Sequence, residues 1–230
     1  MKRIVFLLFS FALLFNVTTA SAAREGTVFR RVDCEEKLIA LTFDDGPHPE
    51  KTEKVLEVLD HYDVKATFFV VGQNAERYPE IVQRCAEKGH EIGNHTFTHR
   101  YFNRLSALEA ENEIKKDSKL LEALTGVPCR LFRPPGGIFD SASASLASKA
   151  GMKTVIWNVD TKDWAGESAD NIFKNVTKNA CNGSIILFHD YTGNKSHTLE
   201  ALRLVIPYLL NEGYSLVTVS ELISRSNAAG

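Results

Sequence analysis

The 230-residue sequence predicts an α/β protein, an irregular TIM-barrel-like (β/α)7 barrel of parallel strands and crossover helices. Two observations predict this fold. After Arg24, short apolar runs alternate with longer amphipathic runs about seven times. Polar residues also gather directly after the apolar runs. An open doubly wound sheet would spread these polar residues along one edge, whereas a barrel brings all strand C-terminal ends to one rim, so the barrel is favoured.

The predicted strands are rich in β-branched and aromatic residues. They are Leu38 to Phe43, Ala66 to Val71, His90 to Gly93, Arg130 to Arg133, Thr154 to Val159, Ser184 to Phe188 and Ser215 to Val219. The predicted helices carry apolar residues at three- and four-residue spacing, and several are followed by glycine, which ends a helix at low cost. They are Pro49 to Tyr62, Tyr78 to Lys88, Ser106 to Thr125, Ser141 to Ala150, Ala169 to Asn179 and Thr198 to Glu212.

The first 22 residues have the pattern of a secretory signal peptide. Lys2 and Arg3 precede an apolar run from Ile4 to Phe15, and the small residues Ala20-Ser21-Ala22 follow. This run is shorter than the about 20 residues that cross a bilayer as a helix, so we expect no membrane span after cleavage, with an uncleaved anchor as the alternative. The predicted organisation is a signal peptide (1–22), a lead-in (23–36) and one domain (37–230), secreted or held in the cell envelope, in the periplasm or cell wall.

The composition is that of a globular domain, with 44% hydrophobic and 24% charged residues. The formal net charge of −2 gives no basic excess, so we expect no nucleic-acid partner. No glycine-rich phosphate-binding motif follows a predicted strand, so nothing predicts a nucleotide cofactor. The oligomeric state stays open.

The four cysteines, Cys34, Cys85, Cys129 and Cys181, all lie after the predicted signal, where disulfides are plausible. Their places in the predicted barrel put them at the rim opposite the polar residues. Three pairings are possible. The neighbouring positions of Cys85 and Cys129 favour that pair first, leaving Cys34 with Cys181.

Two adjacent carboxylates, Asp44 and Asp45, follow the first predicted strand and precede Gly46-Pro47. Successive residues at a strand end point in different directions, so one carboxylate could bind a metal ion while the other accepts a proton. A turn or a helix cap before Pro47 is the alternative interpretation.

His95 and His99 follow the third predicted strand, four residues apart. On one helical turn they would share a face and could bind the same cation. Neutral imidazole suits zinc and other late transition metals, and the Asp45 carboxylate would complete a set of three ligands with positions left for water and substrate. An ordinary solvated pair of histidines is the alternative.

Further polar residues end the later strands, in Arg133-Pro134-Pro135-Gly136-Gly137, Asp160-Thr161-Lys162-Asp163-Trp164 and Leu187-Phe188-His189. An arginine there could hold a carboxylate in its ionised form, and a glycine turn could aim a backbone N–H at an oxyanion. A histidine beside a carboxylate stays protonated to a higher pH, as a general acid requires.

Five segments of the sequence resemble, in order and spacing, the motifs of the polysaccharide deacetylases, carbohydrate esterase family four. They are T-F-D-D, H-T-F-T-H, R-P-P-G-G, D-T-K-D-W and L-F-H. The resemblance runs from about Leu38 to Leu222 and makes residues 37–230 the catalytic domain. It implies the following roles: Asp45, His95 and His99 as metal ligands; Asp44 as general base, oriented by Arg133; His189 as general acid, tuned by Asp163; and Pro135, Gly136, Trp164 and Leu187 as substrate-binding residues.

The implied activity is metal-dependent hydrolysis of N-acetyl groups on the amino sugars of a peptidoglycan or chitin-type glycan, with release of acetate. The implied cofactor is a divalent metal, zinc first, with Co²⁺, Ni²⁺ or Mn²⁺ as alternatives. An O-acetyl esterase acting on xylan and an inactive glycan-binding domain are the competing hypotheses. The sequence departs from the family at Gly136, where an aromatic residue is common, so we expect a side-chain wall to be missing there.

Overall fold

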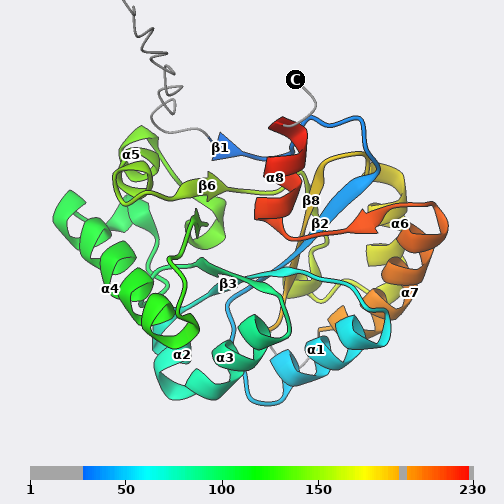
Figure 1. Cartoon of the computed structure of the whole chain (residues 1–230), viewed down its shortest axis with the longest axis horizontal. Coiled ribbons are helices and arrows are strands. Elements are labelled where there is room, and N and C mark those ends of the chain that lie inside the picture. The colour runs from blue at the N-terminus through cyan, green and yellow to red at the C-terminus, as the bar shows by residue number, and fades with distance from the viewer. Residues whose placement is uncertain (1–27, 192–195, 228–230) are drawn as a thin grey trace, which may run out of the picture.

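The computed structural model describes residues 28–191 and 196–227. Its strands form a curled sheet in the order β1-β6-β5-β4-β3-β2-β8-β7, with β9 paired to β2, and each strand pairing is parallel (Figure 1). The predicted α/β architecture with an irregular barrel is confirmed. The strands are β1 Val28–Phe29, β2 Leu38–Asp44, β3 Thr67–Val70, β4 Glu91–Asn94, β5 Leu131–Phe132, β6 Lys153–Val155, β7 Val159–Asp160, β8 Ser184–His189 and β9 Ser215–Leu216.

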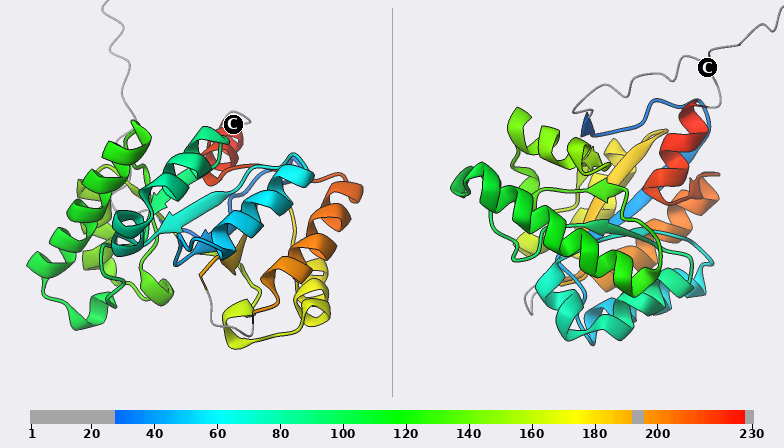
Figure 2. Two further views of the ribbon diagram at one scale, coloured as in Figure 1. Left: turned by 90° about the horizontal axis from the view of Figure 1, so that it is seen from below. Right: turned by 60° about the vertical axis from the view of Figure 1, so that its left-hand side comes forward.

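Most helices cover the outer side of the sheet, as the views in Figures 1 and 2 show, whereas α8 packs against its inner face. They are α1 Lys51–His61, α2 Gly72–Arg77, α3 Pro79–Glu87, α4 Ala107–Thr125, α5 Ser141–Lys149, α6 Ala169–Asn179, α7 Thr198–Asn211 and α8 Val219–Asn227. Three short 3-10 turns, η1 Phe102–Arg104, η2 Pro135–Gly137 and η3 Asp163–Ala165, follow β4, β5 and β7.

The central strand β2 separates two apolar clusters because its side chains alternate between the two faces of the sheet. Ile39, Leu41 and Phe43 face the outer helices, where Phe43 stacks on a neighbouring phenylalanine of β3 at 5.0 Å between ring centroids. Leu38 and Ala40 face the inner cluster, to which α8 contributes apolar residues. The same alternation makes Thr42 and Asp44 the next inner residues, so the inner face changes from apolar to polar along β2.

Some elements differ from the prediction. The predicted strand Thr154 to Val159 is two strands, because residues 156–158 leave the sheet between β6 and β7. The predicted strand Ser215 to Val219 ends at Leu216, and Val219 already begins α8. The sequence also did not predict β1, α2 or α8. The backbone N–H groups that open α2 and α8 donate to distant segments, for example Gly72 to the Thr96 carbonyl (3.0 Å) and Val219 to the Thr67 hydroxyl (3.0 Å).

All four cysteines are free thiols, so neither predicted disulfide is present. Cys85 is buried in the outer core cluster, and the Cys129 thiol lies 3.4 Å from the Leu131 carbonyl oxygen. The Cys181 sulfur instead accepts a hydrogen bond from Arg31 at 3.4 Å.

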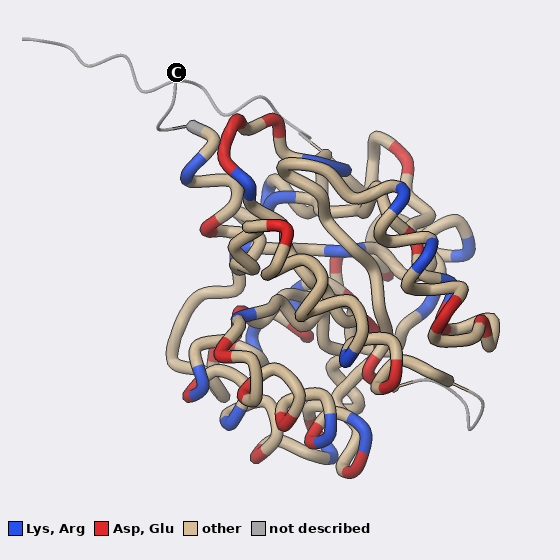
Figure 3. The backbone as a smooth tube through the Cα atoms, turned by 90° about the vertical axis from the view of Figure 1, so that its right-hand side faces the viewer, with Lys and Arg blue, Asp and Glu red and all other residues tan. Residues whose placement is uncertain are grey.

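Charges of both signs are interspersed over the outer helices (Figure 3). Within residues 28–191 and 196–227, the helices are too short or too polar to cross a membrane. The predicted signal peptide and residues 23–27 of the lead-in lie outside the described residues.

We expect Gly183→Ala to destabilise the protein far more than Gly126→Ala. Both glycines have left-handed backbones, with φ of +77° and +73°, so either change costs about 1 to 2 kcal/mol of strain. A Cβ at Gly183 would lie 1.6 Å from the Val32 carbonyl oxygen, whereas nothing lies within 4 Å of one at Gly126. In urea denaturation, Gly183→Ala should lower the free energy of unfolding by roughly 2 kcal/mol more than Gly126→Ala does. Equal decreases for the two variants would contradict the close approach at Gly183.

Candidate metal centre and active site

The end of β2 directs its two carboxylates to different places. Asp44 is the last strand residue, on the inner face and almost fully buried. Asp45 has a left-handed backbone, with φ of 77°, which turns it away from the strand direction. The side chain of Asn74 donates to the Asp45 carbonyl oxygen at 2.8 Å and stabilises this turn.

His95 and His99 lie on a loop after β4, not on a helical turn as the four-residue spacing suggested. Thr96 and His99 have left-handed backbones, with φ of 68° and 58°, which no α-helix permits. Asn94 accepts a hydrogen bond from the Thr96 N–H (2.9 Å), and the Thr96 hydroxyl accepts one from the His99 N–H (3.1 Å). The loop therefore brings the two imidazoles together without helical geometry.

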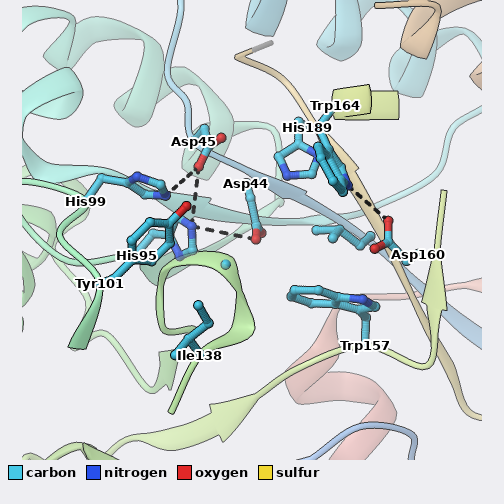
Figure 4. Close-up of a pocket in the computed structure, with 12 residues that line it drawn as sticks. Asp44, Asp45, His95, His99, Tyr101, Ile138, Trp157, Asp160, Trp164 and His189 are labelled. Carbon is cyan, nitrogen blue, oxygen red and sulfur yellow. Dashed lines mark hydrogen bonds and ion pairs between the residues drawn. The ribbon is translucent and has the colours of Figure 1, made fainter. Parts of the chain in front are cut away.

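Asp45, His95 and His99 present a ligand set suited to one cation. The Asp45 Oδ1 atom lies 3.4 Å from His95 Nε2 and 3.0 Å from His99 Nε2, and the three ligand atoms fall within 4.8 Å of one another (Figure 4). Ligands of one tetrahedral cation at about 2.1 Å are separated by about 3.4 Å, so these positions fit. The Arg133 carbonyl oxygen lies 2.7 Å from His95 Nδ1, which keeps the proton there and leaves Nε2 for a metal.

The charges around these ligands favour a cation. Burial alone would lower the pKa of the His95 imidazole, but the carboxylates of Asp44 and Asp45 raise it above its ordinary value. Burial would likewise raise the pKa of the Asp45 carboxyl, and its contacts with His95 and His99 lower it instead. The carboxylates of Asp44 and Asp45 therefore favour a positive charge at the imidazole nitrogens.

Arg133, directly after β5, is fully buried and binds Asp44. Its Nη1 donates to Asp44 Oδ1 at 2.6 Å and to the Thr42 hydroxyl at 2.9 Å. The other carboxylate oxygen, Oδ2, lies 3.7 Å from His95 Nε2. One oxygen of Asp44 is thus held by a guanidinium while the other faces the metal ligands.

His189, at the end of β8, is paired with the buried Asp163 of η3. Its Nδ1 lies 2.8 Å from Asp163 Oδ1, so Nδ1 donates and Nε2 is left for the cavity. Burial would lower the pKa of His189, but the hydrogen bond and charge of Asp163, with the charges of Asp44 and Asp45, raise it to about 9. Asp163 also accepts from the Thr198 hydroxyl at 2.7 Å and from the His189 N–H at 2.8 Å.

One cavity of about 340 Å³ joins these groups (Figure 4). Of the predicted substrate-binding residues, Gly136, Trp164 and Leu187 line it, while Pro135 is buried and does not. Arg133 and Asp163 also lie outside the lining and contact Asp44 and His189, respectively. Asp160 lines the cavity as well and accepts a hydrogen bond from the Trp164 indole at 3.4 Å.

Several residues around the site were not singled out from the sequence. Tyr101, Ile138 and Trp157 line the cavity. Glu113 of α4 accepts hydrogen bonds from the Thr98 N–H (2.7 Å) and hydroxyl (2.8 Å), between the two histidine ligands. No local pattern marks these residues, since they reach the site from separate segments.

Comparisons with known proteins find deacetylases among the relatives of this chain. A model of the polysaccharide deacetylase family matches residues 31–155. A peptidoglycan-N-acetylglucosamine deacetylase of Bacillus cereus is 43% identical over 200 residues, which cover 86% of this chain and 93% of the relative. A chitooligosaccharide deacetylase of Azorhizobium caulinodans is 37% identical over 198 residues, covering 81% of this chain and 94% of the relative.

The crystal structure of a peptidoglycan N-acetylglucosamine deacetylase matches the fold with a TM-score of 0.82 and 38% identity, over 86% of this chain and 92% of that one. Its curled parallel sheet is the architecture described above. The chain belongs to the polysaccharide deacetylase family.

Proposed function

We propose that this chain is a metal-dependent N-deacetylase that removes acetyl groups from the amino sugars of peptidoglycan or of chitin-type oligosaccharides and releases acetate. The observation that carries the proposal is one cavity holding the Asp45–His95–His99 ligand set, with Asp44 and His189 beside it. The names of the relatives, which act on peptidoglycan and chitooligosaccharides, support the same substrate class.

Asp44 is the proton acceptor in the proposed reaction. Asp45, His95 and His99 would hold a divalent cation, which when bound would supply Lewis-acid chemistry to the acetyl carbonyl and to water. Arg133 holds one carboxylate oxygen of Asp44, and the oxygen facing the ligands accepts a proton from the attacking water. The Gly136 turn lies on the same cavity and could direct its backbone N–H to the oxyanion.

His189 is the proton donor. Cleavage of the amide leaves an amine, which departs only when its nitrogen receives a proton. Asp163 fixes the ring and keeps it protonated near neutral pH, and the Nε2–H of His189 then protonates the nitrogen. The products are acetate and a glucosamine-type sugar.

We propose zinc as the cation, because two imidazole nitrogens and one carboxylate oxygen are ligands that zinc prefers and leave positions for water and substrate. We also propose that the chain is exported through residues 1–22, since a cell-envelope glycan lies outside the cytoplasm.

The substrate class can be tested with defined glycans. Acetylated glucosamine oligomers and acetylated xylan are incubated with the zinc-loaded protein and analysed by mass spectrometry. We expect the mass of one acetyl group to be lost per modified sugar from the glucosamine oligomers. Faster loss from xylan would identify an O-acetyl esterase, and loss from neither would indicate a glycan-binding domain.

Substitutions should separate metal binding from proton transfer. We expect Asp44→Asn to retain stoichiometric zinc and lose about 10²- to 10⁴-fold in kcat, because only the base is removed. His95→Ala should lose the zinc itself, measured by elemental analysis. His61→Ala, on the outer helix α1, is the control that keeps both metal and activity. Full zinc in His95→Ala would refute the ligand set.

The basic side of the pH profile should depend on Asp163. His189 acts in its protonated form, so activity falls as pH rises through its pKa, which Asp163 raises to about 9. Asp163→Asn removes that negative charge, and the fall in kcat should move to lower pH by at least about one unit. Asp160→Asn is the control, because Asp160 has no bond to His189 and should leave the position of the fall unchanged. An unmoved profile in Asp163→Asn would exclude the proposed pairing.

A further inference from the structure

Two consecutive glycines of η2 lie against two aromatic rings. A Cβ added to Gly136 would lie 2.8 Å from Tyr101 Cε1, and one added to Gly137 would lie 2.7 Å from Trp157 Cη2. Both rings line the cavity that holds the metal ligands. Because these two glycines have no side chains, the Tyr101 and Trp157 rings can occupy the space beside them.

The Trp157 ring is part of the buried framework. Its centroid lies 5.5 Å from the Arg133 guanidinium carbon, and it packs against the inner apolar cluster. These contacts hold the partly buried ring from the protein side.

Tyr101 is different, because the residue is 37% exposed and lines the cavity. Its centroid lies 6.2 Å from that of His99, and the Arg104 guanidinium lies 5.7 Å from it (Figure 4 shows the ring beside the two histidines). Among the described residues, no side chain or backbone group bonds to the Tyr101 hydroxyl. The residue thus offers a ring face and a hydrogen-bonding group with no other assigned partner.

This placement corrects one expectation from the sequence. Gly136 stands where an aromatic residue is common in the family, and we expected a side-chain wall to be missing there. The wall is present, because the Tyr101 ring from the segment after the metal loop occupies the space over Gly136. In this chain the aromatic side chain at this place comes from Tyr101 and not from residue 136.

We propose that the Tyr101 side chain forms the sugar-binding wall of the cavity and sets the preference of the site for an amino-sugar ring. Gly136, which has no side chain, leaves the space that the Tyr101 ring occupies. This inference rests on the proposed function. A pyranose ring presents an apolar C–H face to an aromatic ring and hydroxyl groups at its edge, which the phenol can bind. The wall lies beside His99, so the sugar would contact it while its acetyl group reaches the metal ligands.

The first test compares Tyr101→Ala, Tyr101→Phe and Tyr191→Ala. The substrate is tetra-N-acetylchitotetraose, assayed for kcat and KM, and its Kd is measured by calorimetry with each change in a zinc-loaded Asp44→Asn background. Tyr101→Ala should raise KM and Kd about three- to tenfold with unchanged zinc content. Tyr101→Phe should recover most of the loss. Tyr191 is 45% exposed but does not line the cavity, so Tyr191→Ala should bind normally.

The second test asks whether Gly136 acts through Tyr101. Gly136→Ala should weaken substrate binding in the wild-type background, because its Cβ displaces the Tyr101 ring in addition to the backbone strain at a φ of +63°. In the Tyr101→Ala background that space is empty, so the same change should weaken binding much less, a non-additive result.

The outcomes separate the two proposals. A wild-type protein that deacetylates no glucosamine oligomer would refute the proposed function. Deacetylation by wild type with unchanged Kd in Tyr101→Ala, or with additive effects of the two substitutions, would overturn the role of Tyr101 alone.

Discussion

The buried ion pair between Arg133 and Asp44 is the interaction on which the site and its surroundings depend. A guanidinium with no exposed surface is costly unless every donor finds a partner. Besides Asp44 and Thr42, its donors reach the backbone carbonyls of Val155 (3.2 Å) and Ile156 (3.0 Å). The carbonyl of Arg133 in turn orients His95. One residue therefore links the proposed base Asp44, the proposed metal ligand His95 and the end of β6.

The contacts of Arg133 also coincide with the break between β6 and β7. The chain leaves β6 at the residues whose carbonyls bind Arg133 and joins the opposite edge of the sheet at β7. In between, the Ile156 N–H donates to the Phe29 carbonyl (2.7 Å) and the Asn158 N–H to the Ile185 carbonyl (3.2 Å). The broken strand keeps its backbone groups paired while it supplies acceptors to a buried charge. In a continuous strand, the carbonyls of Val155 and Ile156 would instead accept hydrogen bonds from a neighbouring strand.

The sequence predicted what depends on local pattern. Alternating apolar runs located the strands, and polar residues after them, such as Asp44 and His189, indicated a shared rim. It did not predict the loop that carries His95 and His99, because four-residue spacing fits a helix equally well. It also missed the wall made by Tyr101. That contact joins segments about 35 residues apart, and the only local sign of it was the absence of a side chain at Gly136.

The metal ligands themselves lie where regular structure ends. Asp45 and His99 have left-handed backbones, a conformation that costs a non-glycine residue of order 1 kcal/mol or more. Their neighbours must hold them there, and they do so with side chains from other elements: Asn74 of α2 bonds the Asp45 carbonyl, and Glu113 of α4 bonds Thr98. The ligand positions are thus set by the packing of α2 and α4 against the sheet. Two histidines four residues apart therefore form a metal site here because helices outside the motif fix the loop between them.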